Sequence, residues 1–142
     1  MANPNPLPYI SNQVQVYIPH SAITADVAAA DAALVQIAGA KKIMIELTEG
    51  GTVLNRQCDL TVQVSLDGIN FFAYNMLISN ATNTNSQQFV RVATQNIAAA
   101  GTTLLFMTPE TLGAFTHLRI PMDVTDGATP TGNFTVKVSV QT

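Results

Sequence analysis

The chain has 142 residues, of which 47% are hydrophobic and 11% are charged, and its formal net charge is −3 at pH 7. This length suits one domain with a full-sized core. Its six Lys and Arg residues are scattered, which argues against nucleic-acid binding because that needs a clustered basic surface. No apolar run approaches the ~20 residues of a membrane-spanning helix. The composition therefore predicts a partner that is neither nucleic acid nor membrane.

The first ten residues predict an extended arm that is rich in proline. Proline fixes φ and disfavours helix in the residue before it. The arm could be a disordered tail, or it could lie on a neighbouring subunit. It lacks the basic and apolar regions of a signal peptide, and the single cysteine excludes an internal disulfide framework, so we expect assembly in a cytoplasm. The candidate partner-binding residues are Asn3, Pro4, Asn5, Pro6, Leu7, Pro8 and Tyr9.

The segment Leu60–Phe72 gives the clearest structural signal. Its apolar residues alternate with polar ones from Leu60 to Leu66, and this period of two is typical of a strand with one buried face. Asp67-Gly68 then interrupts the pattern, and this dipeptide between two strand-like runs favours a hairpin. The segment 134–141 alternates in the same way. Together the two segments predict an antiparallel β protein.

Residues 11–142 are predicted to form one domain of about eight short strands. Turns are expected at Gly50-Gly51 and at 126–132, whereas Ser21–Ala33 could be either a loop or one or two helical turns. Since no helix pattern alternates with the strands, we expect an antiparallel β-sandwich of jelly-roll type. The strands are expected at Val14–Ile18, Leu34–Ala38, Lys42–Thr48, Cys58–Leu66, Ile69–Ile78, Phe89–Ala93, Thr103–Met107, Phe115–Val124 and Asn133–Gln141.

The residues that could carry chemistry do not form a recognisable constellation. His20 and His117 are far apart in the sequence, and a zinc site needs three or four ligands, so we interpret them as surface or turn residues. Cys58 begins a strand in phase with buried positions, which predicts an inert thiol. Asp67 and Asp123 are better explained by turns than by calcium, which takes six to eight oxygen ligands. We therefore expect no enzyme activity, no metal and no cofactor.

The low charged fraction is a weak indication of assembly. It is less than half of the roughly 25% that is usual in globular domains. A free monomer normally relies on charged side chains for solubility. A subunit that is permanently packed against neighbours needs them less, so the polar surface of Thr, Asn, Gln and Ser suits a component of a larger particle.

The order of the segments resembles small β-sandwich structural proteins of tailed bacteriophage particles. Their pattern has a strand, an S-x-DG-x-x-F hairpin, an F-x-x-L/V-R strand and a final alternating strand led by glycine. The resemblance covers roughly Lys41 to Val140. The matching residues are Ser65, Asp67, Gly68, Phe71, Phe115, Leu118, Arg119, Gly132 and Val136.

This resemblance implies a virion structural protein, in particular a capsid decoration (cement) protein on the surface of the phage head. The implied partners are the major capsid protein and further copies of the chain, with a homotrimer favoured. A carbohydrate-binding module of a viral fibre or spike is the alternative, and it would use Tyr9, Tyr17 or Tyr74 with the loop Ser79–Ser86. Discoidin-like carbohydrate-binding sandwiches usually have Trp where Phe71 stands, and the absence of Trp from this chain weakens the alternative.

Overall fold

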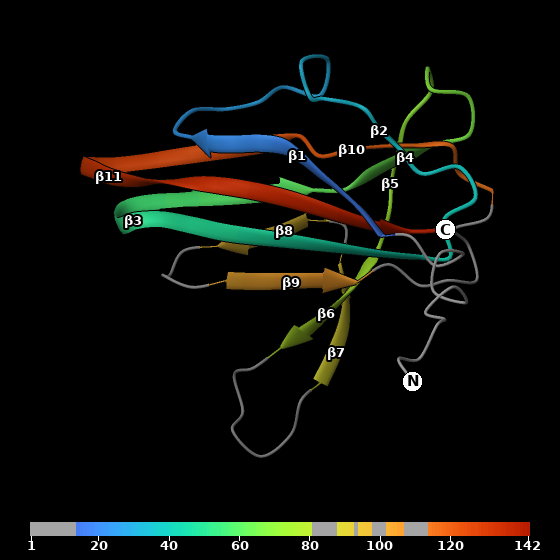
Figure 1. Cartoon of the computed structure of the whole chain (residues 1–142). Helices are drawn as coiled ribbons and strands as arrows, with labels where there is room; N and C mark the ends of the chain where they lie inside the picture. Colours follow the sequence, from blue (N-terminus) through green and yellow to red (C-terminus); the bar gives the residue numbers. More distant parts are fainter. Residues whose placement is uncertain (1–13, 81–87, 93, 98–101, 107–113) are drawn as a thin grey trace, which may run out of the picture.

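The computed structural model describes residues 14–80, 88–92, 94–97, 102–106 and 114–142. Within these residues the chain is all-β, without a helix, and its strands form two antiparallel sheets (Figure 1). The strands are β1 (Val14–Ile23), β2 (Val35–Gln36), β3 (Lys42–Thr61), β4 (Gln63–Ser65), β5 (Phe72–Ala73), β6 (Met76–Asn80), β7 (Gln88–Val92), β8 (Thr94–Ile97), β9 (Thr102–Phe106), β10 (His117–Arg119) and β11 (Met122–Gln141).

The larger sheet has seven strands in the order β1-β11-β3-β9-β6-β7, and β8 also pairs with β3. The smaller sheet has four strands in the order β2-β10-β4-β5. The antiparallel all-β prediction is confirmed. The expected number of short strands is not: the described residues form 11 strands, and β3 and β11 have 20 residues each. The jelly-roll connections and the division into residues 1–10 and 11–142 stay predictions.

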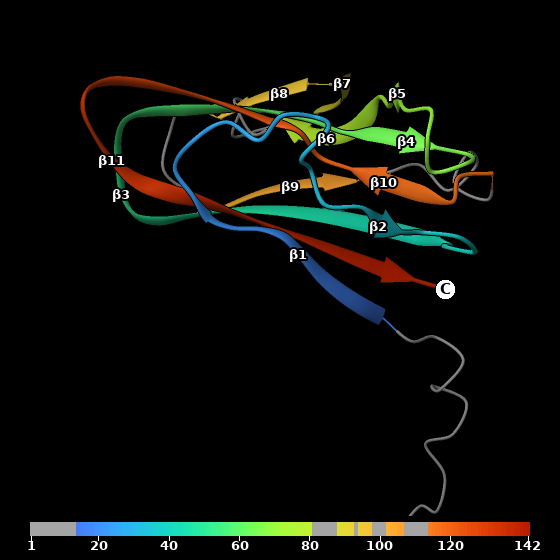
Figure 2. The ribbon, with the colours of Figure 1, turned by 90° about the horizontal axis from the view of Figure 1, so that it is seen from above.

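The two long strands bend near their middle and pass from one layer of the molecule into the other (Figure 2). Gly50-Gly51 lies inside β3, and the segment 126–132 lies inside β11. The two segments are opposite each other, because Asn133 pairs with Gly50 and the register shifts on both sides of Thr131. The predicted turns at these two places are therefore wrong. Their glycines allow a coupled bend of two paired strands instead of ending them.

Side chains and backbone fix this bend tightly. Gly132 has φ +83°, and a Cβ atom on it would lie 2.6 Å from Cγ2 of Val53. Arg56 donates from Nε and Nη2 to the two carboxylate oxygens of Asp126, at 2.6 and 2.9 Å, and from Nη1 to the Gly132 carbonyl. The hydrogen bonds from Arg56 lower the pKa of Asp126. One arginine thus joins both strands where the ladder is irregular.

The β3–β11 ladder continues into β4 and β10 in the same register. β3 and β11 pair up to Leu60 and Met122, and after a short interruption β4 and β10 pair with no shift. Pro121 lies at the interruption, where it has no N–H to donate. Its carbonyl still accepts a hydrogen bond from the Thr61 N–H at 3.1 Å. Four strand segments therefore behave as two long strands with one proline defect.

The segment Ser21–Ala33 forms the end of β1 and an irregular connection, and no helix is assigned in it. The connection contains one hydrogen-bonded turn, in which the Ala28 carbonyl accepts from the Asp31 and Ala32 N–H groups at 3.0 Å. The connection nevertheless supports β11. The N–H groups and carbonyls of Val27 and Met122 exchange two hydrogen bonds at 2.8 and 3.0 Å. Asp26 accepts from the Val124 N–H at 2.7 Å. Backbone and carboxylate together replace a strand neighbour for this part of β11.

One hydrophobic core lies between the layers. The two halves of β3 contribute to it on either side of the bend, with Ile43, Ile45 and Leu47 before it and Cys58 and Leu60 after it. Period-two alternation in both halves directs the apolar side chains inward. The other members of the core are Val35, Ile37, Ala40, Val62, Val64, Leu118, Ile120, Met122, Phe134, Val136, Val138 and Val140.

Phe134 tests this core, because it is fully buried and large. Phe134→Ala should lower the free energy of unfolding by about 3–5 kcal/mol, through lost burial and the cavity that remains. Leu54→Ala is the matched control, because Leu54 is 56% exposed and should change stability by no more than about 0.5 kcal/mol. Chemical denaturation of both variants measures the difference, and equal losses would contradict the assigned core.

Candidate functional site

The residues that could carry chemistry are separated and have structural roles. His20 is 5% exposed, and its Nε2 donates to the Ile120 carbonyl at 2.6 Å. It therefore satisfies a backbone oxygen beside the Pro121 defect, and its predicted place at the surface is wrong. His117 is half-buried, and its Nδ1 lies 2.8 Å from Thr116 Oγ1. Alternation assigned His117 to the polar face of its strand, and His20 lay outside the predicted strand Val14–Ile18. The sequence could not show which groups either histidine contacts.

The predicted hairpin after β4 exists, but its connection is longer than two residues. β4 pairs with β5 through Val64 and Phe72, so a loop covering 66–71 joins them. Leu66, which alternation placed in the core, is 55% exposed in this loop. Gly68 has φ +77°, and a Cβ atom on it would lie 3.1 Å from the ring of His117. Glycine is thus required both by the backbone angle and by the space.

The Asp67 carboxylate holds this loop together. Its Oδ1 accepts from the Ile69 and Asn70 N–H groups, both at 2.8 Å, and from Ser65 Oγ at 2.9 Å. Its Oδ2 accepts from Asn70 Nδ2 at 2.7 Å. These hydrogen bonds, with those from Asn70 the strongest, lower the pKa of Asp67 well below its usual range. The carboxylate closes a turn and is not directed at a ligand.

The lowered pKa predicts a pH-dependent contribution to stability. Because the folded state favours the charged carboxylate, its contribution is complete above the unfolded pKa near 3.8 and is lost as the pH falls toward the lower folded pKa. Asp67→Asn should melt at a lower temperature at pH 7, because an amide NH2 would face the donor on Asn70. The gap between wild type and variant should narrow below about pH 4. A gap independent of pH in melting curves would contradict this role.

Cys58 has the properties of a buried structural thiol. It is fully buried, and burial is the main reason why its pKa rises from 9.0 to about 12, followed by the nearby charges of Asp59, Asp123 and Asp26. A nucleophilic cysteine needs the opposite, a lowered pKa and access to substrate. The predicted burial of Cys58 is confirmed, and its inertness stays a prediction.

Thiol reactivity checks this assignment. At pH 8 the folded protein should react with a thiol reagent at least on the order of a hundredfold more slowly than the protein unfolded in denaturant, because the thiolate is the reacting form. The unfolded sample is the control, since it contains the same single thiol. Comparable rates in the two samples would show that Cys58 is accessible and ionisable.

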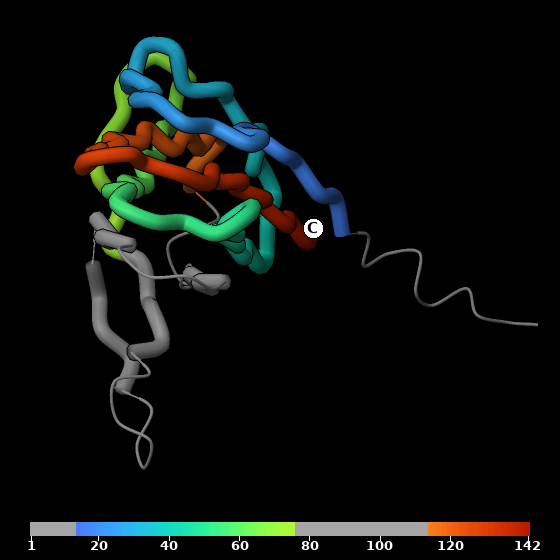
Figure 3. The backbone as a smooth tube through the Cα atoms, turned by 90° about the vertical axis from the view of Figure 1, so that its left-hand side faces the viewer, coloured from blue at the N-terminus to red at the C-terminus, as the bar shows by residue number. Residues whose placement is uncertain are grey.

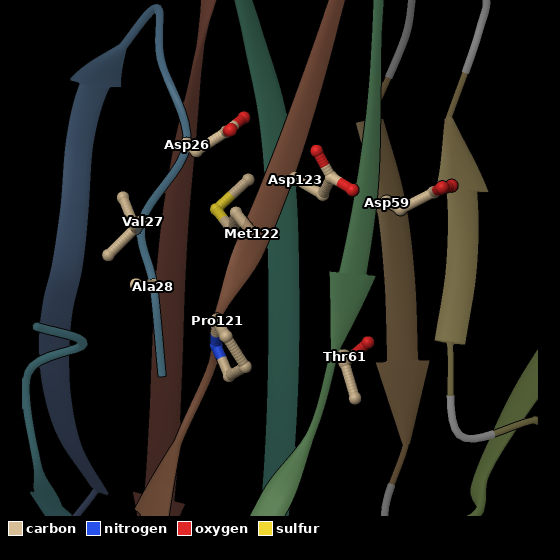
Figure 4. Close-up of a pocket in the computed structure, with 8 residues that line it drawn as sticks. All are labelled: Asp26, Val27, Ala28, Asp59, Thr61, Pro121, Met122 and Asp123. Atoms are coloured by element: carbon tan, nitrogen blue, oxygen red, sulfur yellow. The ribbon is translucent and has the colours of Figure 1, made fainter. Parts of the chain in front are cut away.

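The clearest hollow in the described part of the chain is an open groove of about 440 Å3 with three carboxylates on its wall (Figure 4). Asp59 and Asp123 are directly opposite each other on β3 and β11, and Asp26 comes from the connection after β1. Asp26 is already engaged by the Val124 N–H. Among the described residues no group of three or more His, Cys, Asp or Glu is arranged to hold a metal ion. The groove is thus an acidic surface.

The exposed apolar side chains of the described surface include one group on β1 and one near the Asp67 loop, besides Leu34, Met44 and Leu54. On β1, Val14, Val16 and Ile18 are 57, 59 and 55% exposed. Near the Asp67 loop, Ile69 and Phe72 are 81 and 60% exposed. The sequence missed the first group, because alternation in β1 does not show which of its two faces meets the core. Apolar surface of this kind is typical of interaction sites when it is contiguous.

The tyrosines named for glycan binding are either partly buried or outside the described residues. Tyr17 and Tyr74 are partly buried against the core, and the ring of Tyr74 packs edge-on to Phe115 at 5.8 Å. Both rings are therefore partly covered by the core. Phe71 stacks under Arg119, whose Cζ atom lies 3.9 Å from the ring centre. The candidate arm residues from Asn3 to Tyr9 and most of the loop Ser79–Ser86 lie outside the described residues.

The comparisons with known proteins concern the fold. No family model and no curated protein matches the chain. No helix in the described residues is long and apolar enough to cross a membrane. A crystal structure of the SPBc2 prophage-derived protein YomS is similar, with a TM-score of 0.61 and 11% sequence identity, and the match covers 92% of this chain and 95% of that one. The chain thus shares its fold with a prophage-derived protein over nearly its whole length.

Proposed function

We propose that the protein is a structural component of a bacteriophage particle, and specifically a decoration protein that binds the outside of the assembled head. The observation that carries this proposal is the fold match to a prophage-derived protein over 92% of the chain. The sequence pattern from Lys41 to Val140 supports the same class of protein. This support is independent, because the pattern is a property of the sequence and does not depend on the fold match.

The described surface supports binding through surface contacts. Two of its carboxylates, Asp67 and Asp26, accept hydrogen bonds from backbone N–H groups. This surface also exposes apolar side chains on β1 and near the Asp67 loop, and a partner could cover them. If contacts with the shell bury ~400 Å2 of apolar area, the gain is at most roughly 10 kcal/mol before association costs. Repetition over many sites then lets modest contacts stabilise a shell.

In this role the arm and exposed loops bridge neighbouring shell subunits, and the trimer is the preferred state. Each bridge raises the barrier to expansion or rupture of the shell, since the contacts must break before the subunits separate. No catalytic step is part of the proposal. A carbohydrate-binding role would instead require saturable binding on a glycan panel, with Phe72 and Tyr9 as the aromatic residues to substitute.

Sedimentation of particles from the native source tests the proposal. Phage particles should carry this chain at hundreds of copies each, because a decoration protein follows the repeat of the shell. The control is the same lysate after the particles have been disrupted, where the chain should move to light fractions. A few copies per particle would place the chain in the tail, a fibre or a vertex. Its absence from intact particles would overturn the structural role.

A further inference from the structure

Among the residues that the structure describes, no strand pairs with the outer edge of β1. β1 is the terminal strand of the larger sheet and is paired to β11 on one side (Figure 3). From Val14 to Tyr17 the pairing with β11 is regular. On the same stretch Val14, Val16 and Ile18 expose more than half of their surface. Backbone donors and acceptors therefore lie beside an apolar row.

Edge strands usually carry features that prevent further pairing, such as charged residues, prolines and bulges. In β1 these features are confined to the second half. Pro19 lies there, and the register with β11 shifts between Tyr17 and His20 and again before Ile23. The half from Val14 to Ile18 has none, and no Asp, Glu, Lys or Arg occurs in the first 25 residues. This half is thus suited to accept one more strand.

The segment that precedes β1 has the pattern of such a strand. Prolines occupy positions 4, 6 and 8 and alternate with Asn5, Leu7 and Tyr9. In an extended chain alternate residues direct their N–H groups to opposite sides. Residues 5, 7 and 9 would therefore offer N–H groups on one side, while the prolines offer none on the other. Such a segment can add to one sheet edge and then ends the sheet.

We propose that residues 4–9 of a second copy of this chain add as a strand to the edge Val14–Ile18. In the register that places Leu7 and Tyr9 on the face of Val14, Val16 and Ile18, both apolar sets are buried together. Thirteen residues precede β1, and extended they span up to about 45 Å, enough to reach a neighbouring subunit. Each copy gives one arm and accepts another, and such head-to-tail exchange closes into a ring.

A disulfide between two chains tests the exchange. One chain carries Leu7→Cys, and a second chain with a tag of different mass carries Val16→Cys. After mixing and mild oxidation we expect a mixed disulfide, because paired positions on neighbouring strands bring Cβ atoms to within roughly 5.5 Å. The native Cys58 should not form a disulfide under these conditions, because it is buried. Leu7→Cys mixed with Ala128→Cys is the control, since Ala128 is exposed at the bend, far from Val14.

The double variant Leu7→Cys/Val16→Cys separates exchange from folding back within one chain. A disulfide that forms only within this double variant would show that the arm covers its own β1. Absence of any specific disulfide would show that the edge binds something else, and either result overturns the exchange. Val16→Lys gives a second measurement. It should convert the arm-exchanged oligomer to monomer in sedimentation, while circular dichroism shows that the monomer keeps its β structure; its melting temperature is free to fall, because association stabilises the folded state. Ala128→Lys should leave the oligomer intact, and an oligomer that survives Val16→Lys contradicts the proposal.

The inference rests on the proposed function for its biological meaning, because it assigns the contacts that join copies of a particle subunit. Its test uses the purified chain alone. A failed exchange therefore leaves the sedimentation of the chain with particles unaffected, and a chain absent from particles leaves the disulfide result standing.

Discussion

The bend in the paired strands β3 and β11 is the feature on which the rest of the structure depends. Each strand has 20 residues and passes through both layers, so a single ladder supplies most of the core on both sides. Ile45 before the bend and Leu60 after it belong to the same buried cluster. If the bend were straightened, the apolar faces of the two halves would no longer meet, and the core would lose its enclosure.

Where the strand pairing is irregular, polar side chains supply hydrogen bonds that the ladder lacks. Arg56 joins the two strands at the bend, Asp26 accepts a backbone N–H of β11, and His20 donates to the carbonyl of Ile120. The bond of His20 is buried, and a buried backbone group without a partner costs roughly 1–3 kcal/mol. The bonds of Asp26 to Val124 and of Arg56 to Asp126 are exposed, and they hold the strands together where proline and glycine interrupt the ladder. In a sequence, charged residues and histidines of this kind are candidates for catalysis. In the structure each is held in its own place by the bonds just described, so they do not come together in one site.

What the fold leaves open is a strand edge and exposed apolar rows. Together with the low charged fraction they favour a protein that acts by being held against neighbours. The fold match is to a prophage-derived protein, and the sequence resemblance is to structural proteins of tailed bacteriophage particles. Both observations concern the class of protein. The evidence for arm exchange is separate, and it comes from the outer edge of β1 and the alternating prolines before it.

The sequence by itself determined the all-β class, the antiparallel pairing and most of the core, because period-two alternation in segments such as 60–64 and 134–140 reports directly which face is buried. It also identified the Asp67-Gly68 hairpin and the burial of Cys58. Tertiary structure alone decided that Gly50-Gly51 and Gly132 bend two paired strands, since a glycine permits a turn and a bend equally and the partner strand selects between them. It also decided that His20 is buried and that Val14, Val16 and Ile18 are exposed, because alternation fixes two faces of a strand without showing which one meets the core.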